Sequence, residues 1–168
     1  MLRNLFKSRP SRKLAEALYA QAVAQARLPA FYVDMGAPDR IDSRFELYTL
    51  HVLLLILRLR EDGRKGADAA QDLFDTYASA LDNTLRELGV GDVSVGKKMR
   101  KLGEALYGRM SAYEGAILAE DVDALALALT RNIMEVEAAT PGMRALADQP
   151  FDGVMSAPAW PEPVLAPA

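Results

Sequence analysis

A glycine-rich segment that ends in lysine is the part of the sequence nearest to a known chemical motif. Residues 91–98 read Gly-Asp-Val-Ser-Val-Gly-Lys-Lys and match the first seven positions of a phosphate-binding loop. That loop requires Ser or Thr after the lysine to hold magnesium, and a strand before it, but here Lys98 follows and the preceding residues have helical periodicity. The segment therefore predicts a tight turn between two helices, made by Gly89, Gly91, Asp92 and Gly96.

Four cations follow the glycine segment and lie in the first two turns of the helix that we expect after it: Lys97, Lys98, Arg100 and Lys101. The amino end of a helix carries partial positive charge, so cations there cost from a few tenths to ~1 kcal/mol. One interpretation is an anionic partner. The other is a solvated face neutralised by acids of the preceding helix, such as Asp75 or Asp82, and the sequence leaves both open.

Residues suited to catalysis or metal binding are scarce. The chain has no cysteine, and His51 is its single histidine, so a catalytic triad, a multi-histidine site and thiolate ligands are excluded. His51 lies in the most apolar segment, which favours a core residue with satisfied hydrogen bonds. The carboxylates of residues 68, 72, 75 and 82 are spaced like the polar face of an amphipathic helix. We expect no enzymatic activity and no cofactor.

Helical periodicity runs through most of the chain and predicts the elements that position these residues. The first helix covers 12–28, a loop follows to residue 38, and a central helix begins near Arg44 behind a capping box of Ser43 and Glu46. Further helices are expected over 67–88, from a Ser94 cap to about 117, from an Asp121 or Asp123 cap to about 133, and from Thr140 with Pro141. The predicted fold is an all-α, compact bundle of five to six helices.

Composition and charge set the domain organisation. We expect a basic amino-terminal arm over 1–11, a helical domain over 12–149 and a flexible proline-rich tail over 150–168 that contains Trp160. The net charge of −3 argues against DNA binding. The longest apolar run, 47–57, is too short to span a membrane, so we expect a cytoplasmic protein, with peripheral attachment to the inner membrane as an alternative. The arm has the composition of an anchor for anionic lipid or ribosomal RNA, and also of an ordinary chain end.

One long segment resembles a known family. Residues 86–99 (Arg-Glu-Leu-Gly-Val-Gly-Asp-Val-Ser-Val-Gly-Lys-Lys-Met), followed by Tyr107, Gly108, Arg109 and Tyr113, are similar to the signature of the ubiquinol–cytochrome c chaperone family. The resemblance extends more weakly over 12–138. It implies an all-helical assembly factor that binds newly made cytochrome b and supports assembly of the cytochrome bc1 complex, with a ribosome and a small protein as further partners.

The resemblance and the charges together suggest a docking mechanism. Lys97, Lys98, Arg100, Lys101 and Arg109 would meet acidic or phosphate groups of a partner, and Tyr107 with its apolar neighbours would cover a nascent membrane helix. Gly103 and Gly108 predict either a packing seam or a groove for that helix. Two alternatives stay open: a lipid- or quinone-binding protein, which needs a polar cavity around His51, and a plain helical adaptor.

Overall fold

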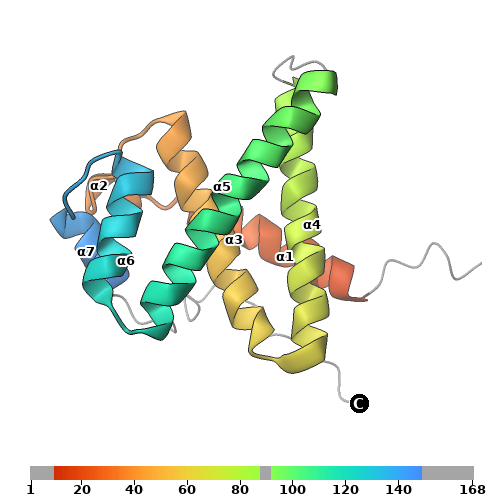
Figure 1. The fold of residues 1–168 in the computed structure, drawn as a ribbon, viewed down its shortest axis with the longest axis horizontal. Helices are drawn as coiled ribbons and strands as arrows, with labels where there is room; N and C mark the ends of the chain where they lie inside the picture. The colour runs from red at the N-terminus through yellow and green to blue at the C-terminus, as the bar shows by residue number, and fades with distance from the viewer. Residues whose placement is uncertain (1–9, 88–91, 149–168) are drawn as a thin grey trace, which may run out of the picture.

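The protein folds into helices packed around one long central helix (Figure 1). A computed structural model describes residues 10–87 and 92–148, and all regular structure in these ranges is helical, which confirms the all-α fold. The elements, in chain order, are α1 (Pro10–Gln25), α2 (Pro29–Val33), α3 (Ile41–Arg60), α4 (Gly63–Glu87), α5 (Asp92–Leu118), α6 (Val122–Leu129), the π-helical turn η1 (Thr130–Met134) and α7 (Pro141–Ala147).

Several predictions fall on residues outside this description. They are the basic arm except for its last two residues, the proline-rich tail, and the turn glycines Gly89 and Gly91. Asp92 and Lys98 belong to α5, but their side chains are also outside the described part.

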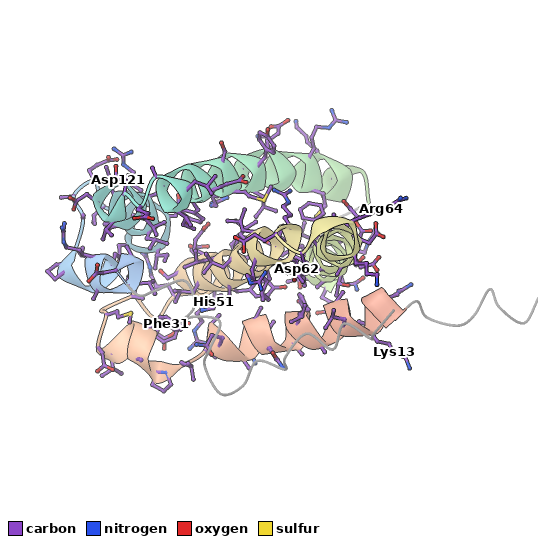
Figure 2. All side chains as sticks on the ribbon, turned by 90° about the horizontal axis from the view of Figure 1, so that it is seen from below. Lys13, Phe31, His51, Asp62, Arg64 and Asp121 are labelled. Carbon is purple, nitrogen blue, oxygen red and sulfur yellow. The ribbon has the colours of Figure 1, made fainter. Side chains whose placement is uncertain are left out.

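The helix α3 separates two hydrophobic cores and supplies side chains to both. Leu47, Leu50 and Leu53 pack in one core with residues of α2, α6, η1 and α7, and with Tyr113 of α5. Leu55 and Leu59 pack in the other core with α1, α4 and Leu106 of α5. Figure 2 shows α5 along one side of α3 and α1 along the other. The prediction of an apolar central helix is therefore confirmed.

The amino end of α3 differs from the predicted capping box. The helix begins at Ile41 after Arg40, and no side chain caps it. The Ser43 hydroxyl instead donates a hydrogen bond to the carbonyl of Ile133 at 2.8 Å, and Glu46 pairs with Arg109 at 2.5 Å. Both side chains are buried in tertiary contacts, so the local pattern was misleading.

Two predicted helix starts near the carboxyl end of the domain are confirmed. The Asp121 carboxylate accepts a hydrogen bond from the backbone N–H of Ala124 at 2.9 Å and caps α6. The Thr140 hydroxyl accepts one from the N–H of Met143 at 3.3 Å, ahead of Pro141. These caps succeed because a single local hydrogen bond satisfies an orphan backbone donor.

Other boundaries also differ from the predicted ones, and α1 ends at Gln25, three residues before its predicted end. A short helix, α2, replaces part of the expected loop because Phe31 is buried and draws that segment onto α3. The helix α4 begins at Gly63, four residues early, and Gly66 explains the close corner: a Cβ there would collide with the carbonyl of Leu59. The helix α5 begins at Asp92, ahead of the predicted Ser94 cap.

Candidate docking surfaces

The first candidate surface is the outward stripe of α5 that starts with its cations. Lys97, Arg100 and Lys101 are exposed, and their spacing of three and four residues places them along one side of the helix. None of them makes an ion pair with a side chain that the structure describes. The acids considered as their neutralising partners are engaged within α4: Asp82 with Arg86 at 2.6 Å, and Asp75 with Gln71 at 2.9 Å.

The start of α5 removes one argument for an anionic partner. Because the helix begins at Asp92, Lys97 lies in its second turn, with Arg100 and Lys101 in its third. The helix dipole acts mainly within the first turn. These cations therefore carry little dipole penalty, and the case for docking depends on their exposure.

The same stripe continues into an aromatic side chain and a run of small residues. Tyr107 is 73% exposed and lines a surface hollow of about 410 Å³ with Ile56, Phe74 and Met110. Beyond it, Gly108 and Gly115 are exposed, and a Cβ placed at Gly103, Gly108 or Gly115 would have no atom within 4 Å. A packing seam inside the protein is thus excluded for these glycines in the described part of the chain, and their helix face is open.

Arg109 lies apart from the exposed cations and faces the protein interior. Its Nη2 atom donates to Glu46 Oε1 at 2.5 Å, and the two side chains are only 21% and 9% exposed. Burial raises the pKa of Glu46, and the charge of Arg109 acts in the opposite direction. The pair joins the middle of α5 to the first turns of α3. Sequence reasoning missed it because Glu46 also fits a local cap.

Two further hydrogen bonds join buried or half-buried polar side chains of different helices. The hydroxyls of Thr49 and Tyr77 lie 2.8 Å apart, and the Asn132 amide donates to the Tyr113 hydroxyl at 2.7 Å. These bonds satisfy polar groups within mainly apolar cores and fix the positions of α3 against α4 and of α5 against η1.

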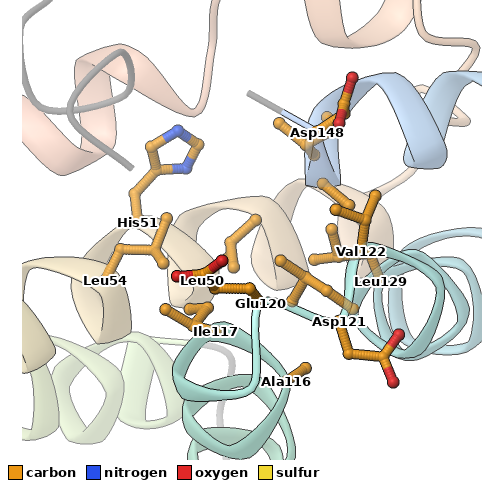
Figure 3. Close-up of a pocket in the computed structure, with 13 residues that line it drawn as sticks. Leu50, His51, Leu54, Ala116, Ile117, Glu120, Asp121, Val122, Leu129 and Asp148 are labelled. Atoms are coloured by element: carbon orange, nitrogen blue, oxygen red, sulfur yellow. The ribbon is translucent and has the colours of Figure 1, made fainter. Parts of the chain in front are cut away.

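The second candidate surface is a pocket at His51 (Figure 3). It has a volume of about 260 Å³ and lies between α3, the end of α5, α6 and α7. Its walls are mainly apolar, with Leu50, Leu54, Ile117 and Leu125 among them. The polar cavity required by the lipid- or quinone-binding alternative is therefore not what surrounds His51.

His51 itself is a core histidine. Only 1% of the residue is exposed, its ring packs edge-on against Phe31 at 5.2 Å between centroids, and its Nδ1 lies 2.6 Å from the carbonyl of Leu47. A carbonyl only accepts hydrogen bonds, so Nδ1 carries the proton and Nε2 keeps a lone pair. Burial lowers the pKa of His51, which keeps the ring neutral.

Comparison with known proteins identifies the family of this helical array. Residues 33–150, more than half of the chain, match the family described as ubiquinol-cytochrome C chaperone. The chain belongs to this family. The matched range contains all of α5 and therefore the whole exposed stripe. No helix in the described part of this family member is both long and apolar enough to cross a membrane.

Individual relatives agree with the family match. The crystal structure of the Cbp3 homolog from Brucella abortus is similar with a TM-score of 0.74 and 35% identity, over 88% of this chain and 83% of that one. Ubiquinol-cytochrome-c reductase complex assembly factor 1 of Xenopus laevis is 24% identical over 74% of this chain and 62% of its own length. The mouse protein of that name is also 24% identical, over 42% of its length. The chain thus spans less than two thirds of these curated relatives.

Proposed function

We propose that this member of the ubiquinol–cytochrome c chaperone family is a non-enzymatic assembly factor of the cytochrome bc1 complex that binds newly made cytochrome b. The family match and the names of the curated relatives support the assembly role. The observation that carries the binding role is the exposed stripe of α5, where cations without a described ion-pair partner lead into Tyr107 and an open glycine face.

The stripe suits a nascent membrane protein in two ways. Exposed lysine and arginine attract acidic or phosphate-bearing groups, and Lys97, Lys98, Arg100 and Lys101 would make this first contact. Small residues allow two helix backbones to approach closely, as at interfaces between membrane helices, so the face at Gly108 and Gly115 would accept a client helix. The client would leave when its contacts within the complex replace those with α5.

Further partners fit the same proposal. The basic arm over residues 1–11 would hold the protein near the ribosome or an anionic membrane surface, and a small partner protein would complete the chaperone. Arg109 contributes through its ion pair with Glu46, which positions α5 on α3.

A complementation experiment tests this function. The gene is deleted, and the strain receives the wild type or the charge-reversed variant Lys97→Glu, Arg100→Glu, Lys101→Glu. A control variant has the same charge change at exposed positions away from α5: Lys13→Glu, Arg64→Glu, Lys65→Glu. Circular dichroism and thermal unfolding verify that both variants fold. Assembled bc1 complex is measured by native gel and by the b-haem absorbance spectrum.

We expect the deletion and the α5 variant to lack assembled bc1 complex, and the control variant to restore it. Full restoration by the folded α5 variant would contradict docking through the stripe. Normal bc1 levels in the deletion strain would contradict the assembly function.

A further inference from the structure

The pocket at His51 combines an apolar interior with an acidic rim. Glu120, Asp121 and Asp148 lie among its lining residues, and the lining contains no lysine or arginine. Asp121 is occupied in capping α6, and Figure 3 shows its carboxylate pointing away from His51. Glu120 and Asp148 are the exposed acids that remain available at the rim.

These two acids stand where helices normally favour cations. The helix α5 ends at Leu118, two residues before Glu120, and α7 ends at Ala147, directly before Asp148, so each acid lies near the negative end of a helix dipole. The last turn of α5 contains no basic residue, and Arg144, the basic residue in the last turn of α7, is paired with Asp123 of α6. Two helix ends and two carboxylates therefore concentrate negative potential at one opening, and the complementary ligand group is a cation.

The interior of the pocket limits what lies next to that cation. Its volume of about 260 Å³ is below the ~300–1,000 Å³ typical of sites for small molecules, and its rim repels anionic lipids. One large side chain of a protein segment suits this volume. The Nε2 lone pair of His51 has no hydrogen-bond partner in the described structure, so an indole N–H or a phenol O–H can donate to it.

The acidic rim and the small apolar interior of the pocket are complementary to one end of a membrane-spanning helix, the end that is flanked by positive charges. Trp and Tyr are enriched at the membrane interface, and Lys and Arg are enriched in the adjoining cytoplasmic loops. We propose that the His51 pocket binds a Trp or Tyr side chain at such a helix end, with adjacent Lys or Arg side chains held by Glu120 and Asp148. This inference rests on the proposed function, because the segment belongs to the client.

The chain's own tail is the competing occupant. It follows Asp148 directly and contains Phe151 and Trp160, but its charged residues are Asp152 and Glu162, with no lysine or arginine. The acidic rim favours the client segment over this sequence, and the binding experiment includes both.

The experiment uses the full chain with isotope label in histidine. Because His51 is the only histidine, its ring gives a single Cε1–H signal that reports on occupation of the pocket. The probes are 15-residue peptides tiled over the organism's cytochrome b, and a peptide of residues 149–163 of this chain. Affinities are measured by fluorescence anisotropy with the same peptides.

We expect the tightest peptides to contain Trp or Tyr next to Lys or Arg, and to shift the His51 signal. Replacing that aromatic residue by Ser, or the adjacent cations by Glu, weakens binding about tenfold or more. The protein variant Glu120→Lys, Asp148→Lys has the same effect, whereas Asp34→Lys, Asp68→Lys, with the same charge change at exposed positions outside the pocket and the α5 stripe, binds like the wild type. The control variant keeps the thermal midpoint of the wild type, and the rim variant keeps or raises it, because lysine suits the carboxyl end of a helix.

Three results would overturn the inference: equal binding of basic and acidic peptides, an unmoved His51 signal during saturable binding, or tighter binding of the 149–163 peptide than of any client peptide. Failure of the proposed function is a separate result. If the deletion strain assembles bc1 normally, the assembly role is wrong whatever the peptides do. If the deletion strain lacks bc1 but the folded rim variant restores it and binds peptides normally, only the pocket assignment is wrong.

Discussion

The ion pair between Arg109 and Glu46 leads to a quantitative prediction, because it separates a structural role of Arg109 from a role in docking. Replacing Arg109 by Met keeps much of the aliphatic packing but leaves the Glu46 carboxylate 9% exposed without its partner. Removing one member of a buried pair typically costs 3–5 kcal/mol. Since Arg109 is itself 21% exposed, we expect the lower end, about 3 kcal/mol.

The free energy of unfolding is measured by urea titration followed by circular dichroism. A loss of about 3 kcal/mol corresponds to a decrease in Tm of roughly 6 to 12 °C for a domain of this size. The double variant Glu46→Leu, Arg109→Met removes both charges together, so we expect it to be within about 1 kcal/mol of the wild type.

The pH dependence of Arg109→Met provides a second test. Without the arginine, burial and the nearby charges of Asp42 and Glu135 hold the pKa of Glu46 above the value in the unfolded chain. A raised carboxyl pKa gives stability that is present below the unfolded pKa, near 4.5, and is lost as pH rises through the folded pKa. The destabilisation of Arg109→Met should therefore shrink as pH falls from 7 to 4.5.

Two results would refute this reasoning. A cost below about 0.5 kcal/mol at pH 7 would place the pair among ordinary surface ion pairs. A double variant as unstable as Arg109→Met alone would show that the loss comes from packing and not from an unpaired carboxylate.

Three further predictions concern single residues. Gly142→Ala should cost about 1–3 kcal/mol, because a Cβ there collides with the backbone of Met35, whereas Gly103→Ala, with open space, should gain up to about 1 kcal/mol; thermal melts of the two variants compare them. Burial lowers the pKa of His51, so below about pH 6.5 the unfolded chain binds a proton that the folded chain does not. The free energy of unfolding should therefore decrease as the pH is lowered below 6.5, by at most about 1.4 kcal/mol per pH unit, and His51→Gln should lack this slope in urea titrations. Asp121→Ala should lower the free energy of unfolding by about 1 kcal/mol through loss of the α6 cap, and Asp121→Asn should retain most of it in the same titration.

Local patterns predicted the elements well wherever a local interaction decides the outcome. All six predicted helices are present in order within the described residues, and the Asp121 and Thr140 caps were identified because each closes a hydrogen bond within three residues. The position of α3 between two cores followed from its nearly all-round apolar surface.

Predictions failed where a distant contact overrides the local pattern. Ser43 and Glu46 fit a capping box, but the Ile133 carbonyl and Arg109, 90 and 63 residues away, bind them instead. Phe31 forms part of α2 because the core needs its ring, although the surrounding prolines indicated a loop. The close approach at Gly142 depends on Met35, which no spacing in the sequence reveals.

The two candidate surfaces were predictable to different degrees. The cations and Tyr107 of the α5 stripe belong to one helix, so helical spacing alone places them on a shared side. The His51 pocket was not predictable, because α3, α5, α6 and α7 each contribute part of its wall. Only the isolated histidine in an apolar helix drew attention to that region.

The most direct test of the account is site-specific crosslinking from Tyr107. This residue is 73% exposed on α5, and replacing it by the photoreactive analogue p-benzoylphenylalanine preserves an aromatic ring. Val33 of α2, 77% exposed, is the control position. We expect irradiation of cells making cytochrome b to link it to position 107 and not to position 33. Absence of cytochrome b from the products at position 107, in a variant that still supports bc1 assembly, would contradict it.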